Sequence, residues 1–202
     1  FCAARNEPVI VFWSRGGYTP GFVFFKTVLR VLAFNRLPES GNSEKRDKAI
    51  SNRYIQRLWL SFALMDLIFY YSVYLRIQSV VFGKIIVCDR FIYDTFIDFK
   101  LNFSHFKIEK WLLWKILNVL ALKPTKQYVA LISVEESQKR SVLKGEPFPD
   151  TYETLERRLL YYEEYLKSSS VVYINGLHDK LEIHNRIVRE VLVENLENDK
   201  ST

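Results

Sequence analysis

The sequence has few cysteines, no internal repeat and no low-complexity segment, and these absences exclude several classes of protein. Its two cysteines, Cys2 and Cys88, lie far apart in unlike contexts, so neither a disulfide framework nor a zinc site is indicated. Residues 1–8 do not combine a basic start with an apolar core, so a signal peptide is not expected there. The simplest location for such a chain is the reducing cytoplasm.

The composition is that of a globular protein, and the charge suits an anionic ligand. The 202 residues are 49% hydrophobic, which is enough for one core, so we predict a single domain over residues 1–202. The net charge of +6 suits a small anion, a nucleic acid or a membrane surface, and charge alone does not choose among them. The three histidines have no ligand spacing with a cysteine or a carboxylate cluster, so no metal site of protein side chains is predicted.

The most informative stretch is a short apolar run that ends in an Asp-Arg pair. Ile85 to Cys88 follows a glycine and is too short and too evenly apolar for an amphipathic helix, which predicts a buried parallel strand. Asp89 and Arg90 then lie at its carboxyl end, where open α/β sheets bind ligands. A carboxylate can orient a hydroxyl or a water on Mg²⁺, and a guanidinium can bind a phosphate through paired hydrogen bonds. The alternative is that the two side chains pair with each other or with neighbouring charges.

Three further apolar runs have the length of strands, namely Pro8–Trp13, Gln127–Ser133 and Ser170–Ile174. The first is closed by a turn that carries Arg15 beside Gly16 and Gly17, and adjacent glycines let the backbone approach an anion closely. An ordinary loop is the alternative there. Because helical patterns separate the four strands, the predicted fold class is α/β, with a mostly parallel sheet layered by helices.

A long helical pattern from Glu44 to Phe82 admits two interpretations. From Leu58 to Leu75 it is almost wholly apolar, and it approaches the roughly 20 residues required to cross a bilayer. Asp66 lies near the middle, however, where a carboxylate costs about 2.5–3.5 kcal/mol on insertion scales. We therefore predict a buried core helix that ends at Gly83, in which Asp66 and Arg76 either face the ligand crevice or are paired locally.

The segment after the central strand, Phe91 to Phe99, is predicted to form a helix or a tight turn that carries Tyr93, Asp94 and Asp98. An aromatic ring beside carboxylates can stack on a nucleobase and bind its edge or a sugar hydroxyl. The phenylalanines of the segment are expected in the core. Farther along the chain, residues 108–122 predict a strongly apolar helix.

A loop with two prolines and a glycine, residues 141–150, has the composition of a mobile lid. It follows a helix that begins at Val134 and carries Arg140, and Lys144 lies within the loop itself. Cations at the base of a lid can close over a polyphosphate and neutralise its charge. Asp150 is predicted to cap the helix that follows.

Three of these segments resemble, in the same order, those of the thymidylate kinase-like nucleoside monophosphate kinases. Trp13–Pro20 resembles the Arg- and Gly-rich loop that holds the acceptor phosphate, Asp89-Arg90-Phe91 resembles the Asp-Arg-aromatic motif, and Glu135–Tyr165 resembles the lid and the next helix. The resemblance covers nearly the whole chain. It has two departures: no Gly-x-x-x-x-Gly-Lys-Ser/Thr phosphate-binding loop occurs in the sequence, and Asn175 replaces the usual Asp near the adenine-contacting loop.

The resemblance implies a P-loop NTPase fold of the nucleoside monophosphate kinase type that lacks its first strand-loop-helix unit. It implies phosphoryl transfer from ATP, with Mg²⁺ as cofactor, to a nucleoside monophosphate, with dTMP as the leading acceptor. The catalytic residues that it implies are Asp89, Arg90 and Arg140. The acceptor-binding residues would be Arg15, Gly16, Gly17, Asp66, Tyr93, Asp94 and Asp98, and the lid and ATP-binding residues Arg140, Lys144 and Asn175.

The lacking unit leads to a definite expectation about the strands. In the family its strand lies in the middle of the sheet, so residues 8–13 should pair in parallel with residues 85–88. Residues 127–133 should likewise pair with residues 170–174, and no ladder should join the two pairs. The chain by itself should then be inactive as a kinase, because the nucleotide phosphates would lack partners. Its unpaired strand edges should also favour aggregation. Phe1 at the start, in place of Met, predicts an upstream segment.

The same interpretation predicts the partners of the chain. ATP and a nucleoside monophosphate are the expected ligands, and Arg15 and Arg90 should converge on the acceptor phosphate. Nucleic acid and membrane are not expected as partners, and a homodimer is left open.

Two other classes of function are compatible with the residues. A non-catalytic relative that binds a nucleotide or a partner protein would explain the lacking loop, and a membrane-associated protein would explain the apolar helix and the basic charge.

Overall fold

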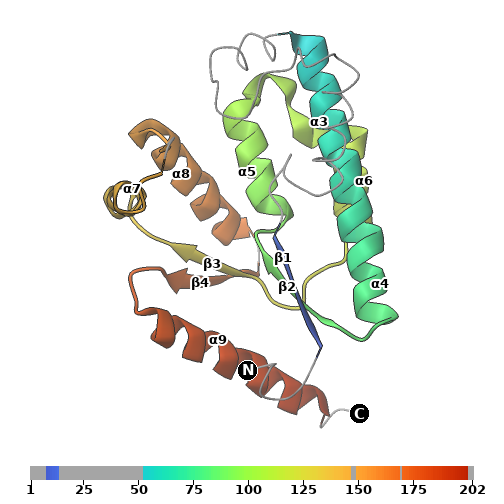
Figure 1. Cartoon of the computed structure of the whole chain (residues 1–202), viewed down its shortest axis with the longest axis vertical. Helices are drawn as coiled ribbons and strands as arrows, with labels where there is room; N and C mark the ends of the chain where they lie inside the picture. Colours follow the sequence, from blue (N-terminus) through green and yellow to red (C-terminus); the bar gives the residue numbers. More distant parts are fainter. Residues whose placement is uncertain (1–7, 14–51, 147–148, 169, 200–202) are drawn as a thin grey trace. The chain divides into compact units, whose positions relative to one another are not determined.

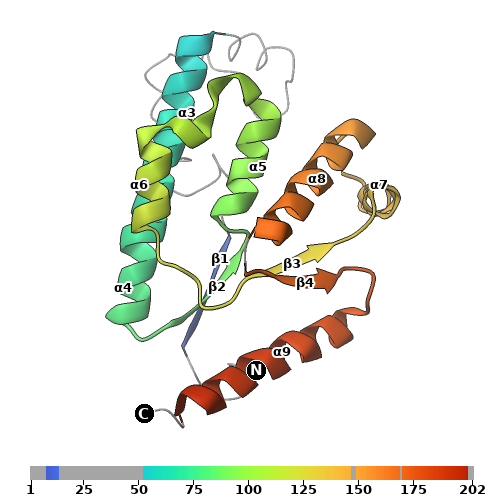
Figure 2. The ribbon, with the colours of Figure 1, turned by 180° about the vertical axis from the view of Figure 1, so that it is seen from behind.

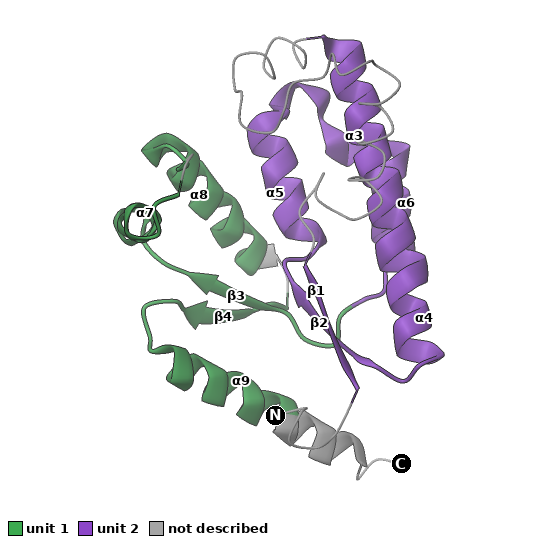
Figure 3. Ribbon diagram, in the orientation of Figure 1, with its two compact units in different colours: residues 1, 124–202 green, residues 2–123 purple. Residues whose placement is uncertain are grey.

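The computed structural model describes four stretches of the chain, residues 8–13, 52–146, 149–168 and 170–199. By their internal contacts the residues divide into two compact units (Figure 3). Unit 2 comprises residues 2–123, and unit 1 comprises residue 1 with residues 124–202. Each unit contains one pair of parallel strands together with helices. The mixed α/β class is thereby confirmed, whereas the single domain and the layered P-loop sheet stay predictions.

Unit 2 is built on a two-stranded parallel sheet. Its strands, β1 (Val9–Trp13) and β2 (Ile85–Asp89), pair over their whole length (Figure 1). Both are rich in β-branched residues, which suit an extended backbone. Neighbouring side chains of a strand point to opposite faces. Phe12 therefore packs into the core with 8% of its surface exposed, whereas Val11 on the other face is 69% exposed.

The helical pattern predicted over residues 44–82 is present in its described part as one continuous run with an irregular turn. α3 (Arg53–Ile68) leads into a π-helical turn, η2 (Phe69–Tyr74), and from there into α4 (Leu75–Val80). Gly83 follows the end of the run with a φ of +60°, as the sequence predicts for a left-handed helix stop.

One face of this helical run forms much of the core of unit 2. Its buried residues recur at spacings of mostly three and four, the period of a helix, and are Leu60, Ala63, Leu64, Leu67, Tyr71 and Leu75. Burial of each leucine side chain stabilises the fold by about 1.5–3 kcal/mol. The sheet and the other helices of the unit complete the core with Phe12, Ile92, Phe99, Ile108, Trp114, Leu117 and Ala121.

The apolar segment after β2 folds as a helix and two tight turns. α5 (Ile92–Asn102) confirms the helix predicted after the Asp-Arg pair. Two 3-10 turns, η3 (Ser104–Phe106) and η4 (Ile108–Lys110), then meet at Lys107, whose φ is +45°. Since this left-handed residue redirects the chain, the helix predicted from residue 108 begins only later.

That later helix, α6 (Leu112–Leu120), lies alongside α3 and α4 in both views of the ribbon (Figures 1 and 2). The Arg57 guanidinium carbon lies 5.5 Å from the centre of the Trp111 ring near the start of α6. At the other end, Arg76 Nη2 donates to the Leu120 carbonyl at 3.0 Å. Arg76 therefore caps the last turn of α6, and a ligand contact of Arg76 stays a prediction.

Unit 1 has a second parallel pair, β3 (Tyr128–Leu131) and β4 (Val172–Asn175). Between these strands the chain forms α7 (Val134–Leu143) and α8 (Tyr152–Ser168), and after them α9 (Lys180–Asp199). Figures 1 and 2 show α8 and α9 on opposite sides of the strand pair. This is the layering that alternating strands and helices predict for a parallel sheet.

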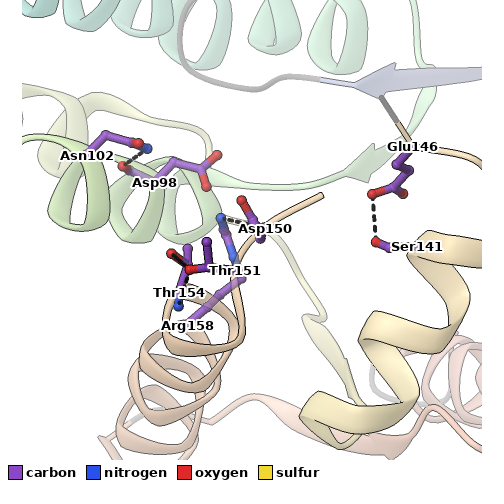
Figure 4. Close-up of polar contacts among 8 residues, drawn as sticks. All are labelled: Asp98, Asn102, Ser141, Glu146, Asp150, Thr151, Thr154 and Arg158. Carbon is purple, nitrogen blue, oxygen red and sulfur yellow. Dashed lines mark hydrogen bonds and ion pairs between the residues drawn. The ribbon is translucent and has the colours of Figure 1, made fainter. Parts of the chain in front are cut away.

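The predicted lid differs from the structure at both of its ends. α7 extends to Leu143, so the connection to α8 begins later than residue 141. At the other end Thr151, and not Asp150, caps α8, because the Thr154 N–H donates to Thr151 Oγ1 at 3.3 Å (Figure 4). Asp150 is instead paired with Arg158, whose Nη2 lies 3.2 Å from Asp150 Oδ2. The Asp150 cap predicted from the sequence is therefore wrong.

The pairing of the strands follows the sequence prediction. β1 pairs only with β2 and β3 only with β4, each pair is parallel, and among the described strands no ladder joins the pairs. All four strand positions are confirmed to within about two residues, the precision expected of element boundaries.

Candidate functional site

The Asp-Arg pair lies where the sequence predicts, at the carboxyl end of β2. Asp89 is the last residue of that strand, and it is paired in register with Trp13, the last residue of β1. The carboxyl ends of both strands therefore lie at the same end of the sheet, where α/β sheets bind ligands. Asp89 is exposed there, and Arg90 is half-buried.

The backbone at Arg90 is strained. Its φ is +77°, and only one other non-glycine residue in the described part of the chain, Lys107, has a positive φ. The left-handed conformation costs a residue with a Cβ about 1–2 kcal/mol. Such outliers persist where the surroundings hold them, and they cluster at active sites and ligand clamps. The Arg90 carbonyl is held here by the hydroxyl of Tyr71, which donates to it at 3.4 Å.

Neither charged group of the pair is neutralised by the part of the chain that the structure describes. The Asp89 carboxylate and the Arg90 guanidinium form no ion pair with each other, and neither has a hydrogen bond to another described residue. The alternative that the two side chains pair with each other is therefore wrong. A guanidinium offers up to five donors in a planar fork, which suits a phosphate.

The residues that begin α5 have mixed roles. The Phe91 N–H donates to Asp94 Oδ2 at 2.8 Å, so the Asp94 carboxylate closes the first turn of the helix. The Tyr93 ring lies 5.7 Å from the Phe96 ring, partly covering it. Asp98 is 6% exposed and lies one turn beyond Asp94 on the same side of α5. Contact of Tyr93, Asp94 and Asp98 with a substrate stays a prediction.

Asp66 lies in the part of the long helical run that contacts residues 91–99 through aromatic rings. The Trp59 ring lies 6.3 Å from the Phe99 ring near one end of this contact, and the Tyr71 ring lies 5.0 Å from the Phe91 ring near the other. The long helical run and residues 91–99 therefore run in opposite directions, and half-buried Asp66 lies between Trp59 and Tyr71 along the run. This position is compatible with the predicted role of Asp66, which no contact tests.

Three of the predicted acceptor-site residues, Arg15, Gly16 and Gly17, lie outside the described residues. The strand before them ends at Trp13 opposite Asp89, at the carboxyl end of the sheet. The predicted convergence of Arg15 and Arg90 stays a prediction.

A second group of predicted residues gathers in unit 1 after β4. Arg140 on α7 donates through Nε to Glu136 Oε1 at 2.7 Å and through Nη2 to the Gly176 carbonyl at 3.2 Å. Asn175 directly precedes that glycine, and its Oδ1 accepts the Leu177 N–H at 3.0 Å. The structure thus brings Arg140 close to the turn at Asn175. Lys144, one turn farther along, is exposed and is not part of this group.

The turn after β4 requires glycine at position 176. A Cβ built on Gly176 would lie 2.8 Å from Ile132 Cγ2 and 3.1 Å from the Leu131 carbonyl oxygen. The Gly176 N–H donates to that same carbonyl at 2.9 Å and so extends the β3–β4 ladder. The close approach fixes the carbonyl that Arg140 binds, so the arginine is held by two independent partners.

The hydrogen bonds of the helix caps and the burial of one thiol shift three pKa values. The pKa of Glu135 is lowered by hydrogen bonds from its own backbone N–H and from the hydroxyls of Ser133 and Tyr152. Tyr152 donates to Glu135 Oε1 at 3.1 Å, which raises the pKa of Tyr152 and joins α8 to the first turn of α7. In unit 2, burial raises the pKa of the Cys88 thiol to about 11, so this thiol is protonated at neutral pH.

Comparison with known proteins returned no match. No protein-family model, no curated protein and no solved structure matches this chain. The resemblance to thymidylate kinase-like enzymes therefore rests on the motifs and stays a prediction.

Sequence reasoning missed two residues that shape these groups. Tyr71 lies in the apolar stretch of the long helix, where its ring suits a core position and nothing in the sequence marks its hydroxyl. Gly176 directly follows β4, and the need for glycine there arises from a contact with Ile132, far away in the sequence.

Proposed function

We propose that this chain supplies the acceptor-binding and lid parts of a nucleoside monophosphate kinase, with dTMP as the leading acceptor and Mg·ATP as the phosphoryl donor. The observation that carries the proposal is the state of Arg90. It is a half-buried arginine with a left-handed backbone at the carboxyl end of a parallel strand, and its guanidinium has no ion pair or hydrogen bond with any residue that the structure describes. Strain and an unused charge at a ligand-binding edge together favour a phosphate clamp.

On the acceptor side, Arg90 would grip the phosphate through paired hydrogen bonds while Asp89 orders the sugar or a water on the metal. Phosphoryl transfer needs little covalent help from the protein, so positioning and neutralisation of charge carry most of the catalysis. The Tyr93 ring, half-buried on the helix that follows, would supply a stacking surface for the base.

On the donor side, Arg140 would neutralise charge on the ATP phosphates. Its anchoring to Glu136 and to the Gly176 carbonyl leaves its remaining guanidinium donors for a ligand. These anchors hold Arg140 beside Asn175, the residue expected near the adenine-contacting loop. The alternative role for the Arg140 side chain is therefore contact with the nucleoside part of ATP.

A magnesium ion fits the residues as part of the nucleotide complex. Among the described residues no group of three or more His, Cys, Asp or Glu side chains gathers around a common point. Mg²⁺ in kinases is commonly held by one or two carboxylates together with the substrate phosphates and waters. Asp89, exposed at the strand end, is the carboxylate that would contact such a complex.

The proposal is tested by titrating the chain with dTMP, with thymidine as the ligand that lacks the phosphate. Loss of charge-assisted hydrogen bonds in Arg90→Ala should raise the Kd for dTMP about 10- to 100-fold. Arg57→Ala removes the same charge from α3 and should change that Kd less than about twofold. If both variants weakened dTMP binding equally, the loss would come from the lower net positive charge of the chain. That result would contradict an acceptor site at Arg90.

A membrane-associated role is the second candidate, because one observation favours it. The helical run Arg53–Val80 is long and apolar enough to cross a bilayer by length and composition, with 33% of its most apolar window buried. Its outer side exposes apolar residues, among them Leu58, Met65 and Phe69. Its inner side, however, is packed against the sheet and α6.

Flotation with vesicles of phosphatidylcholine, with and without phosphatidylserine, separates the two candidates. A chain that binds dTMP and stays at the bottom of the gradient supports the kinase proposal. Flotation that is lost in Met65→Lys would support the membrane role, because this substitution changes only the exposed side of the helix.

A further inference from the structure

The π-helical turn η2 joins the long helix to the strained residue at the candidate site. Within this turn the Leu75 N–H donates to the carbonyl of Tyr70, five residues back instead of four. The additional residue shifts every later side chain by about 100° around the helix axis. Such turns are rare and occur frequently at functional sites.

Tyr71 lies at the centre of this turn and connects it to three other segments. It is fully buried, and its ring meets the edge or face of Phe12 on β1 at 5.7 Å and of Phe91 at 5.0 Å. Its carbonyl accepts the N–H of Leu122, beyond the end of α6, at 2.9 Å. Its hydroxyl donates to the Arg90 carbonyl at 3.4 Å.

These contacts fix the hydroxyl of Tyr71 in space. Two aromatic neighbours prevent the ring from turning away, and the bond from Leu122 holds the backbone that carries it. Phe91, which packs against the ring, is the residue immediately after Arg90. The tyrosine therefore holds the chain on both sides of the peptide bond that follows the strained residue.

We infer that Tyr71 is a positioning residue, whose hydroxyl holds the left-handed backbone at Arg90 and thereby aims the guanidinium at the acceptor phosphate. The inference rests on the proposed function of Arg90. It adds a residue that does not touch the ligand and that acts through the Arg90 carbonyl. The wide turn is then part of the site, because the Leu75 N–H bonds to the Tyr70 carbonyl and leaves the Tyr71 carbonyl to accept the N–H of Leu122 outside the helix.

The test compares two tyrosine-to-phenylalanine substitutions in the same turn. Tyr71→Phe removes the hydroxyl and keeps the ring. Tyr74→Phe is the matched control, because Tyr74 also packs on Phe12, at 6.4 Å, and its hydroxyl has no hydrogen bond to a described residue. Tyr71→Phe should raise the Kd for dTMP about three- to tenfold, and Tyr74→Phe should leave it within about twofold.

The outcomes separate this inference from the proposed function. If Arg90→Ala does not weaken dTMP binding, the acceptor site itself is wrong. If Arg90→Ala weakens binding but Tyr71→Phe behaves like Tyr74→Phe, only the positioning role is overturned.

A measurement without ligand tests the positioning role independently. Glycine at position 90 suits a left-handed backbone and alanine does not, so Arg90→Gly should melt at a higher temperature than Arg90→Ala. In a Tyr71→Phe background the backbone is no longer held left-handed, and this difference in melting temperature should shrink. A difference of the same size in both backgrounds would contradict the inference, whatever the ligand results.

Discussion

The left-handed backbone at Arg90 predicts a reversal of the usual order of alanine and glycine. In a helix interior glycine is less stable than alanine by about 1 kcal/mol, and Arg76 within α4 is such a position. At Arg90, with its φ of +77°, alanine keeps the strain and glycine removes it. Relief of about 1–2 kcal/mol, less the roughly 0.5–1 kcal/mol of additional backbone entropy that glycine loses on folding, leaves glycine more stable by up to about 1.5 kcal/mol.

Urea and thermal unfolding of four variants measure this reversal. We expect Arg90→Gly to be more stable than Arg90→Ala, and Arg76→Gly to be less stable than Arg76→Ala. For a chain of this size 1 kcal/mol corresponds to a change in Tm of about 2–4 °C. Comparison of alanine with glycine at one position cancels the loss of the arginine side chain, which both variants share.

A third position serves as the control for strain without function. Lys107 has a φ of +45° between two 3-10 turns and is not part of the candidate site, so its glycine variant should also be more stable than its alanine variant. Only the substitutions at Arg90 should weaken dTMP binding. If Arg90→Ala were more stable than Arg90→Gly, the reasoning would be refuted, because the backbone at position 90 would then not be strained by a Cβ.

Three further predictions follow from other contacts. Gly176→Ala should destabilise the chain by about 1–3 kcal/mol in urea unfolding, because the new Cβ would lie 2.8 Å from Ile132 Cγ2; an unchanged midpoint would show that the turn can relax. Burial raises the pKa of Cys88 from 9.0 to about 11, so the unfolded thiol ionises first and the free energy of unfolding should fall between about pH 9 and 11. In Cys88→Ala the free energy of unfolding should fall less over this pH range. An identical pH profile in the parent chain and in Cys88→Ala would contradict the prediction. The 202-residue chain, which contains no phosphate-binding loop motif, should show no ATP-dependent phosphorylation of dTMP, and turnover by the purified chain would overturn this.

The strands were predictable because their signals are local. Val9–Trp13 and Ile85–Asp89 are short runs of β-branched and apolar residues, and their order along the chain, together with the resemblance, was enough to predict which strands pair. The stop at Gly83 was predictable for the same reason, since glycine favours the left-handed end of a helix.

The irregular features depend on contacts between distant residues, and the sequence does not show them. The wide turn Phe69–Tyr74 is stabilised by the bond from Leu122, and nothing in its own residues predicts it. The positive φ of Arg90 is likewise not a conformation that arginine itself favours, and the Tyr71 hydroxyl that bonds the Arg90 carbonyl comes from a distant part of the sequence. At the start of α8 two adjacent residues could cap the helix, and the presence of Arg158 decided the outcome, because it engages Asp150 and leaves the cap to Thr151.

The central claim is that the Arg90 guanidinium binds the phosphate of a nucleoside monophosphate. The most direct measurement follows the Nε–H resonance of Arg90 by NMR during titration with dTMP and, separately, with thymidine, with assignment by comparison with Arg90→Lys. The account predicts that dTMP shifts this resonance in a saturable manner and that thymidine does not. Saturable binding of dTMP that leaves the Arg90 resonance unmoved would contradict it.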